Sequence, residues 1–291
     1  MRLFVTGASG WVGSALVPEL IAAGHDVIGL ARSDASAAAL TAAGAQVQRG
    51  DLHDRDSLRA GATAADGVVH LAFIHDFTRF EENQRIDREV VDLFGEVLEG
   101  SDRPLVIASG LVPLDTGKPG SSTGPMIRHA TAAATIQLAE RGVRSVVLGL
   151  PTTVHGAGDH GFIRRIVDTA REKGVSGYID DGAHTWPATH RLDAAHLALL
   201  AVEKAPAGTV VHALAEPGIP TRDIAEAIAR KLDIPAVSIP SEKATDHFGW
   251  LAAMWGTSIT GDSGPTRELL GWAPTHPTLL EDLAQPYYFE N

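Results

Sequence analysis

Three glycines at a fixed spacing are the first residues of this chain that could do chemistry. Gly7, Gly10 and Gly13 follow an apolar run over residues 2–6 and precede a helix-like run over residues 14–23. In such a pattern the first glycine permits a tight turn, the second lets the backbone approach a pyrophosphate, and the third allows close strand–helix packing. The following helix offers free N–H groups to phosphates. We therefore predict a dinucleotide site formed by Thr6, Gly7, Ser9, Gly10, Trp11, Val12 and Gly13.

The residues after the second predicted strand, 26–30, indicate which dinucleotide fits. An acidic residue at this point would bind the adenosine ribose 2′-hydroxyl of NAD. The chain instead has Ala31, Arg32 and Ser33. A guanidinium suits a 2′-phosphate, because it forms charge-assisted hydrogen bonds with the phosphate oxygens. We therefore expect NADP(H) rather than NAD(H), with a solvated surface arginine as the alternative.

The form Thr-Gly-x-x-Gly-x-x-Gly resembles the fingerprint of the extended short-chain dehydrogenase/reductases, the epimerase and dehydratase type. Three later segments share this resemblance. Residues 68–72 resemble the family's Val-x-His-Leu-Ala strand, and residues 151–156 resemble its Pro-x-x-Val-Tyr-Gly segment, with His155 in place of tyrosine. Residues 270–274 resemble its Leu-Gly-Trp-x-Pro signature. The resemblance spans the chain and implies a nicotinamide cofactor across the carboxyl ends of a parallel sheet.

The same resemblance implies further cofactor contacts. In the family an aspartate and an apolar residue border the adenine, and here these would be Asp51 and Leu52. The alternative is that Asp51 caps the helix beginning near Ser57. The other cofactor contacts that the resemblance implies are Leu71, Ala72, Ser109, Arg128 and Pro151.

The family's proton donor is missing from this sequence. Short-chain dehydrogenases protonate their substrate with a tyrosine whose pKa is lowered by a lysine four residues later. The chain has three tyrosines, and none has a lysine at that spacing. The expected positions hold Gly124 and Arg128. Arg128 could bind the nicotinamide ribose but cannot act as a general acid, because arginine stays protonated in proteins.

Other polar residues are therefore candidates for catalysis and for substrate binding. Ser109 ends the fifth predicted strand, where family members carry a serine or threonine that polarises the substrate carbonyl. The proton could come from water held near Ser109 and Arg128, or from His75, His155, Tyr178 or His190. Residues expected to line a mostly apolar substrate pocket are Phe73, His75, Gly110, His155, Phe162, Tyr178, Trp186 and His190. For Trp186 the alternative is packing in the core. The spacing of His155, Asp159 and His160 predicts no metal site.

The elements that would position these residues alternate between strands and helices. This order predicts an α/β protein with a Rossmann doubly wound parallel sheet and a smaller C-terminal α/β substrate-binding region. We expect residues 1–152 to form the NADP(H)-binding domain, with residues 187–215 packing back onto it. Residues 153–186 and 216–291 would form the substrate-binding region.

The composition limits the partners and the compartment. A net charge of −12 without a basic block argues against nucleic acid, and no apolar stretch is long enough for a membrane span. The absence of cysteine and of a signal-like N-terminus fits a cytoplasmic protein. An amphipathic helix over about residues 81–100 resembles the family's dimer helix, so a homodimer is expected, although a face buried on its own sheet would give the same pattern.

These observations together predict an NADP(H)-dependent reductase that transfers hydride to a small organic carbonyl or imine, without the standard tyrosine. One alternative is a protein that binds NADP(H) without catalysis and reports its redox state to a partner. Another is a nucleotide-sugar epimerase or dehydratase, although such enzymes also depend on the missing tyrosine.

Overall fold

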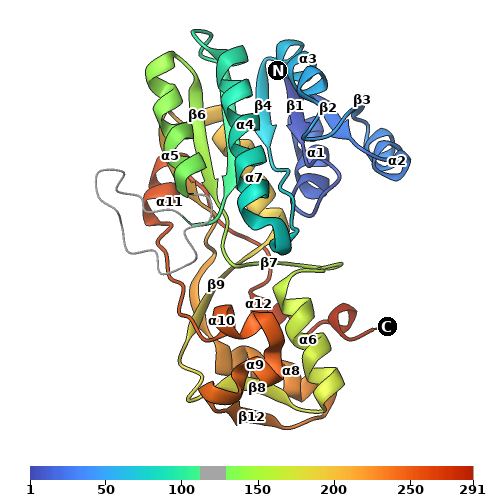
Figure 1. The fold of residues 1–291 in the computed structure, drawn as a ribbon, viewed down its shortest axis with the longest axis vertical. Coiled ribbons are helices and arrows are strands. Elements are labelled where there is room, and N and C mark those ends of the chain that lie inside the picture. Colours follow the sequence, from blue (N-terminus) through green and yellow to red (C-terminus); the bar gives the residue numbers. More distant parts are fainter. Residues whose placement is uncertain (112–128, 291) are drawn as a thin grey trace.

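The computed structural model describes residues 1–111 and 129–290. Its larger part is a seven-stranded sheet in which every pairing is parallel, and the strand order is β10-β6-β5-β4-β1-β2-β3 (Figure 1). The strands are β1 (Arg2–Thr6), β2 (Asp26–Ala31), β3 (Gln46–Arg49), β4 (Gly67–His70), β5 (Pro104–Ser109), β6 (Arg144–Gly149) and β10 (Thr209–His212).

Helices cover both faces of this sheet and bury a separate apolar core on each. One core holds residues from the helices α1 (Gly13–Ala22), α2 (Asp34–Ala42) and α7 (Arg191–Lys204). The other holds residues from α3 (Arg55–Thr63), α4 (Phe80–Leu98) and α5 (His129–Gln137). This is the predicted Rossmann doubly wound α/β fold.

The strand order reverses between β1 and β4, because the chain builds outward through β2 and β3 and then returns to the other side of β1. Ligands of such sheets bind outside the carboxyl ends of the strands at this reversal. The carboxyl end of β1 leads into the glycine-rich turn, and that of β4 leads into residues 71–76. The two segments expected to form the site therefore meet at one edge of the sheet.

The smaller part contains two short sheets and most of the remaining helices, in the lower half of Figure 1. One sheet joins β7 (Thr153–His155), β9 (Thr185–His190) and β11 (Glu216–Pro220), and the other pairs β8 (Ser176–Ile179) with β12 (Ala236–Ile239). The helices of eight residues or more here are α6 (Phe162–Lys173) and α8 (Thr221–Leu232). Short helices follow as α9 (Ala244–Phe248), α10 (Ala252–Trp255) and α12 (Leu279–Asp282).

The chain passes between the two parts repeatedly. After β9, helix α7 packs against α1, and β10 joins the main sheet before β11 returns to the smaller part. Helix α11 (Gly264–Leu270) contacts α7 and β10, and the Trp272 indole Nε1 donates to the Asp193 carbonyl at 3.0 Å. Residues near Trp272 thus pack with the main sheet, although the sequence assigned them to the substrate-binding region.

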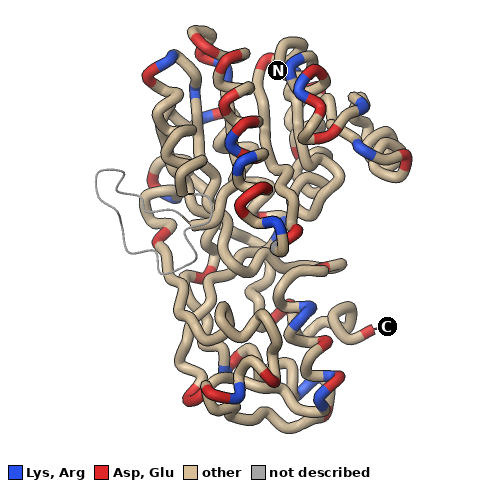
Figure 2. The backbone as a smooth tube through the Cα atoms, in the orientation of Figure 1, with Lys and Arg blue, Asp and Glu red and all other residues tan. Residues whose placement is uncertain are grey.

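The surface of α4 is charged, and its apolar face is covered. Ion pairs join Arg85 to Glu89 and Arg88 to Asp92 along the helix, which appears in Figure 2 as alternating red and blue. The apolar residues Ile86, Val90 and Phe94 lie buried in the core of their own sheet. The amphipathic pattern is therefore explained within one chain, and the homodimer stays a prediction.

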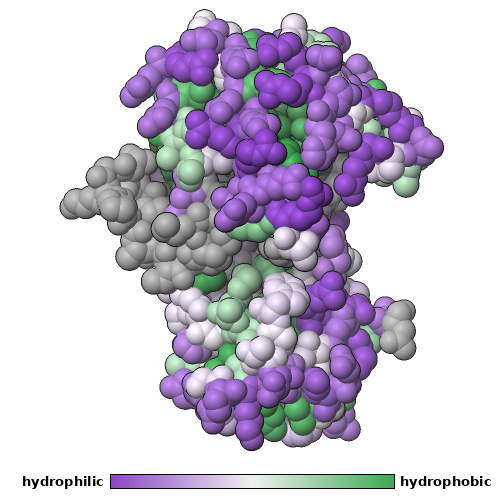
Figure 3. Space-filling model, in the orientation of Figure 1, coloured by the Kyte–Doolittle hydropathy of each residue, from purple (hydrophilic) through white to green (hydrophobic). Residues whose placement is uncertain are grey.

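The face shown in Figure 3 is mostly hydrophilic over the main sheet, and paler, less polar residues gather where the smaller part faces it. No helix within residues 1–111 and 129–290 is long and apolar enough to cross a lipid bilayer.

Candidate dinucleotide and substrate site

The turn between β1 and α1 requires its glycines for steric reasons. Gly7 has a φ of +67°, and a Cβ there would lie 2.6 Å from the Ala72 nitrogen. A Cβ on Gly13 would lie 2.1 Å from the Gly7 carbonyl oxygen, so a side chain would push α1 off the turn. No side chain within the described part of the chain caps the N-terminus of α1. The turn therefore presents the helix N-terminus without a capping side chain to compete with an anion.

The Thr6 side chain faces the interior. Its hydroxyl lies 2.6 Å from His70 Nδ1, and His70 Nε2 lies 3.3 Å from an Asp87 carboxylate oxygen. All three side chains are buried. The Ala72 N–H also donates to the Thr6 hydroxyl at 3.4 Å. The prediction that Thr6 contacts the cofactor does not hold for its side chain. That side chain instead bonds to His70 of β4, and His70 in turn lies next to Asp87 of α4.

Arg32 lies exposed just after β2, at the edge where an adenosine ribose is expected, and its side chain has no ion-pair partner in the described part of the chain. Ser33 is the N-cap of α2, accepting the Ser36 N–H at 3.1 Å. The sequence reasoning missed a second arginine, Arg49, which ends β3 beside Ala31 in the parallel register. Its position at the end of the strand that follows β2 could have indicated that it lies near Arg32. In the structure Arg49 forms an ion pair with the exposed Asp34.

The segment after β3 folds around Asp51. One Asp51 carboxylate oxygen accepts the N–H groups of His53 and Asp54, at 2.8 and 3.2 Å. The N-cap of α3 is Asp54, which accepts the Ser57 N–H at 3.0 Å. The alternative role of Asp51 as a helix cap is therefore excluded, and the cofactor role remains a prediction.

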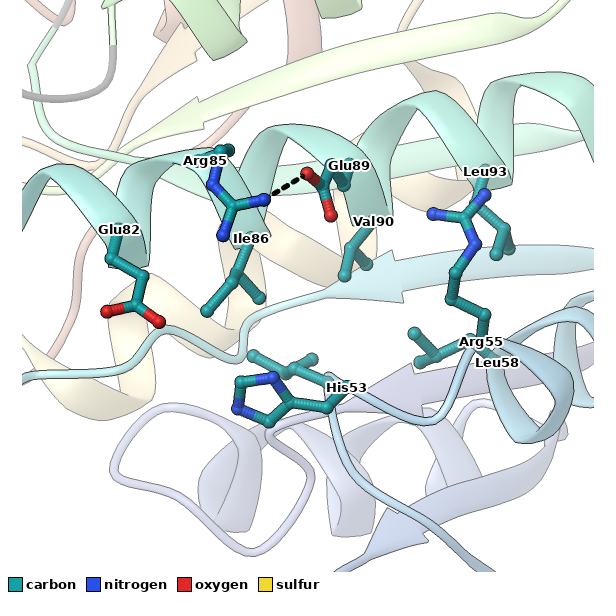
Figure 4. A pocket seen from close by; sticks show the side chains of 10 residues that line it. His53, Arg55, Leu58, Glu82, Arg85, Ile86, Glu89, Val90 and Leu93 are labelled. Atoms are coloured by element: carbon teal, nitrogen blue, oxygen red, sulfur yellow. Dashed lines mark hydrogen bonds and ion pairs between the residues drawn. The ribbon is translucent and has the colours of Figure 1, made fainter.

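Leu52 lines a pocket of about 140 Å³ between this segment and α4 (Figure 4). Arg85 and Glu89 form an ion pair at 2.9 Å along the α4 side. The remaining lining residues are His53, Arg55, Leu58, Glu82, Ile86, Val90 and Leu93.

The residues after β4 lie beside the glycine turn. Leu71, Ala72 and Phe73 are half-buried, and His75 is exposed at the start of the next turn. The rings of Phe73 and His75 contact edge to face at 5.3 Å between centroids. This segment therefore brings one apolar and one titratable side chain to the edge of the sheet where ligands bind.

Ser109 ends β5 two strands from β1, with its backbone paired to Gly149 of β6. Its side chain is 3% exposed, and the hydroxyl has no hydrogen-bond partner in the described part of the chain. Buried hydroxyl groups nearly always form a hydrogen bond. A buried hydroxyl without such a partner at the carboxyl edge of the sheet therefore fits a residue that bonds to a ligand. Gly110 is exposed beyond it, and Pro151 is buried after β6. Gly124 and Arg128 lie outside the described residues.

His155 and His190 face each other where β7 and β9 pair. His155 is fully buried, its Nδ1 lies 2.8 Å from an Asp282 carboxylate oxygen, and its Nε2 has no partner among the described residues. The ring of His190 stacks on His276 at 4.9 Å, and His276 Nδ1 lies 2.8 Å from Asp193. The burial of His155 separates it from solvent, so the structure does not place it at an open pocket.

Burial lowers the pKa of His190 to about 4, and the nearby His155 contributes to this. At neutral pH the ring is therefore uncharged, and its Nδ1 accepts the Leu192 N–H at the start of α7. Its role in the structure is that of a helix cap at the junction of the two parts.

Two residues expected at the substrate pocket lie elsewhere. Tyr178 lies on β8, which pairs with β12 at the end of the smaller part remote from the main sheet (Figure 1), and its ring packs under the Arg222 guanidinium at 5.5 Å. Trp186 is fully buried, and its Nε1 donates to the Met254 carbonyl at 3.1 Å. Both predictions are corrected: Tyr178 is not at the sheet edge, and core packing was the right alternative for Trp186.

Phe162 begins α6 and is half-buried, with its ring edge to face on Trp186 at 6.0 Å. In residues 1–111 and 129–290, no three histidine or acidic side chains lie together as a metal site would require. The residues that the structure does bring together at one edge are the glycine turn, residues 71–75 and Ser109.

Comparison with known proteins agrees with this geometry. Residues 3–99 match the model of the NAD dependent epimerase/dehydratase family. The chain is 46% identical to an uncharacterized protein of Schizosaccharomyces pombe, with 99% of this chain and 100% of that protein covered. It is 26% identical to 4-hydroxy-2-methyl-3-oxo-4-farnesyl-3,4-dihydroquinoline-1-oxide ketoreductase of Stigmatella aurantiaca, covering 98% and 96% of the two chains.

Among solved structures, a nucleoside-diphosphate-sugar epimerase from Pseudomonas aeruginosa superposes with a TM-score of 0.72, at 18% identity, over 98% of this chain and 95% of that one. This likeness concerns the fold. From the shared fingerprint, the sheet topology and these relatives together, the chain belongs to the NAD-dependent epimerase/dehydratase family of short-chain dehydrogenase/reductases.

Proposed function

We propose that the protein is an NADP(H)-dependent reductase that transfers hydride to an organic carbonyl or imine. The observation that carries the proposal is the buried hydroxyl of Ser109 at the carboxyl edge of the sheet, which has no hydrogen-bond partner among residues 1–111 and 129–290. A hydroxyl held there can donate a hydrogen bond to a substrate oxygen or nitrogen. The relative named as a ketoreductase supports a carbonyl substrate.

The coenzyme site would use residues from four segments. The glycine turn and the N-terminus of α1 would hold the pyrophosphate, and Asp51 and Leu52 would border the adenine. Arg32 supports NADP(H), because it is an exposed cation that pairs with no carboxylate of the described residues. Bound NADPH would supply the hydride, and the protein would supply orientation and electrostatics.

The chain's own residues would orient the substrate and supply a proton. Ser109 would hold the carbonyl or imine, and Phe73 would provide an apolar wall beside it. Of the candidate proton donors, His75 is the one that lies exposed at the edge of the sheet. Arg128 retains its predicted role at the nicotinamide ribose. The predicted homodimer and a cytoplasmic location belong to the same proposal.

The test is turnover of NADPH by the purified protein with a panel of ketones, aldehydes and cyclic imines. Oxidation of NADPH that depends on both the protein and one of these substrates is the expected result. If NADPH binds tightly but no compound of the panel is reduced, the protein is better explained as a coenzyme sensor.

A further inference from the structure

A positively charged side chain at the start of α7 lies over the tryptophan of the glycine-rich turn. Arg191 is the first residue of α7, and its guanidinium carbon is 4.6 Å from the ring centroid of Trp11. In the described part of the chain its side chain has no hydrogen-bond or ion-pair partner. A cation in the first turn of a helix opposes the helix dipole, so helix stability does not account for an arginine here.

Trp11 is held so that one face of its ring meets this arginine. Its indole Nε1 donates to the Val154 carbonyl on β7 at 2.8 Å. The ring of His160 contacts it edge to face at 5.5 Å between centroids. The indole, which belongs to the turn expected to hold a pyrophosphate, is therefore fixed between the two parts.

The loop after β7 leaves room for both side chains. Gly156 has a φ of +145°, and a Cβ on it would lie 3.3 Å from Arg191 Cγ. Gly158 has a φ of +85°, and a Cβ on it would lie 3.8 Å from the Trp11 ring. At Gly156 and Gly158 the loop therefore presents no side chain to the arginine or the indole, and its contact with the indole comes from the His160 ring.

We propose that Arg191 binds the pyrophosphate of the dinucleotide, as a side-chain partner to the N-terminus of α1. A guanidinium suits this task, because it stays charged, stacks on an aromatic face and donates two parallel hydrogen bonds to phosphate oxygens. The stack on Trp11 orders the arginine before the coenzyme arrives, which reduces the entropy lost on binding. This inference rests on the proposed dinucleotide site.

The experiment compares coenzyme affinities of the full-length variants Arg191→Gln and Arg32→Gln by calorimetry. The first should weaken NADPH and NADH by the same factor, roughly tenfold, because both coenzymes contain the pyrophosphate. The second should weaken NADPH alone. Arg191→Lys should restore part of the affinity, since it returns the charge without the planar fork. Arg165→Gln, at an exposed arginine of α6, is the matched control and should change neither affinity.

Thermal unfolding without coenzyme separates this role from a structural one. Arg191→Gln should leave the Tm unchanged or raise it, because it removes a cation from a helix N-terminus. Unchanged affinity for both coenzymes, or a loss confined to NADPH, would overturn the inference while leaving the proposed function intact. No binding of either coenzyme by the unsubstituted protein would overturn both. Equal affinities for the two coenzymes, both lowered by Arg191→Gln, would support Arg191 and remove only the NADP preference.

Discussion

Ser109 is the residue to which the proposed function assigns the most specific chemistry. We predict that Ser109→Ala lowers turnover roughly a hundredfold, since it removes a hydrogen bond to charge that develops in the transition state. The affinity of this variant for coenzyme should change much less than its turnover, because the substrate is the main partner proposed for the hydroxyl. Ser145→Ala is the control, because the Ser145 hydroxyl is also buried without a partner among the described residues but lies at the start of β6. Steady-state kinetics and calorimetry of both variants test this, and equal losses in the two would contradict the assignment.

Arg32 and Arg49 allow a second test at single residues. Removing Arg32 with Arg32→Gln should weaken NADPH roughly tenfold and leave NADH unchanged, because only NADPH has a 2′-phosphate. Arg49→Gln should have a smaller effect, because Arg49 already pairs with Asp34. Fluorescence titration with both coenzymes measures the difference. An equal loss for NADPH and NADH in Arg32→Gln would place the arginine away from the 2′-phosphate.

The sequence could predict where residues lie when their position depends on the nearby backbone. The glycine spacing specifies a turn that only glycine can form against Ala72, and Arg32 follows its strand directly. The sequence could not place Tyr178, because its surroundings depend on β12, some 58 residues later. The sequence also left two environments possible for Trp186, because an aromatic residue in a polar segment suits either a pocket or a core.

Strands β1 and β4 and helix α4 are joined by the Thr6–His70–Asp87 series of buried contacts. We predict that His70→Phe destabilises the protein by about 1–3 kcal/mol, because it leaves the Thr6 hydroxyl and the Asp87 carboxylate without this partner. Thr6→Val should cost less, and the double variant should cost less than the sum of the two. Urea unfolding of the four proteins measures the coupling. Strict additivity would show that the contact contributes nothing.

The junction of β9 and α7 should make stability depend on pH. Because the pKa of His190 is lowered from 6.5 to about 4, its contribution is fully present above pH 6.5 and is lost as pH falls through about 4. The side chains of His155, His276, Asp193 and Asp282 face the same ring and act on it electrostatically.

We predict that between pH 6.5 and 4 the free energy of unfolding falls by about 1–3 kcal/mol less in His190→Asn than in the unsubstituted protein. An asparagine can still cap α7 but cannot titrate. His75→Asn, at an exposed histidine, is the control and should keep the original profile. Denaturant unfolding across this pH range measures both, and parallel curves for His190→Asn and the unsubstituted protein would refute the prediction.

At the scale of the whole molecule, the two parts meet around the coenzyme turn. Trp11 bonds to β7, Arg191 stacks on Trp11, and His155 and His190 lie just beyond. Trp11 and Arg191 are 180 positions apart, and no local pattern pairs them. The family resemblance predicted the parallel sheet and the return of residues 187–215 toward it. It could not predict which side chains would meet across the junction, because those contacts depend on how the smaller part packs.

The central claim is that this junction holds NADP(H), and one titration tests it most directly. The unsubstituted protein is titrated with NADPH and with NADH by calorimetry under the same conditions. We predict that both bind at a single site and that NADPH binds roughly tenfold more tightly. NADH binding as tightly as NADPH or more tightly, or no heat with either coenzyme, would contradict the account.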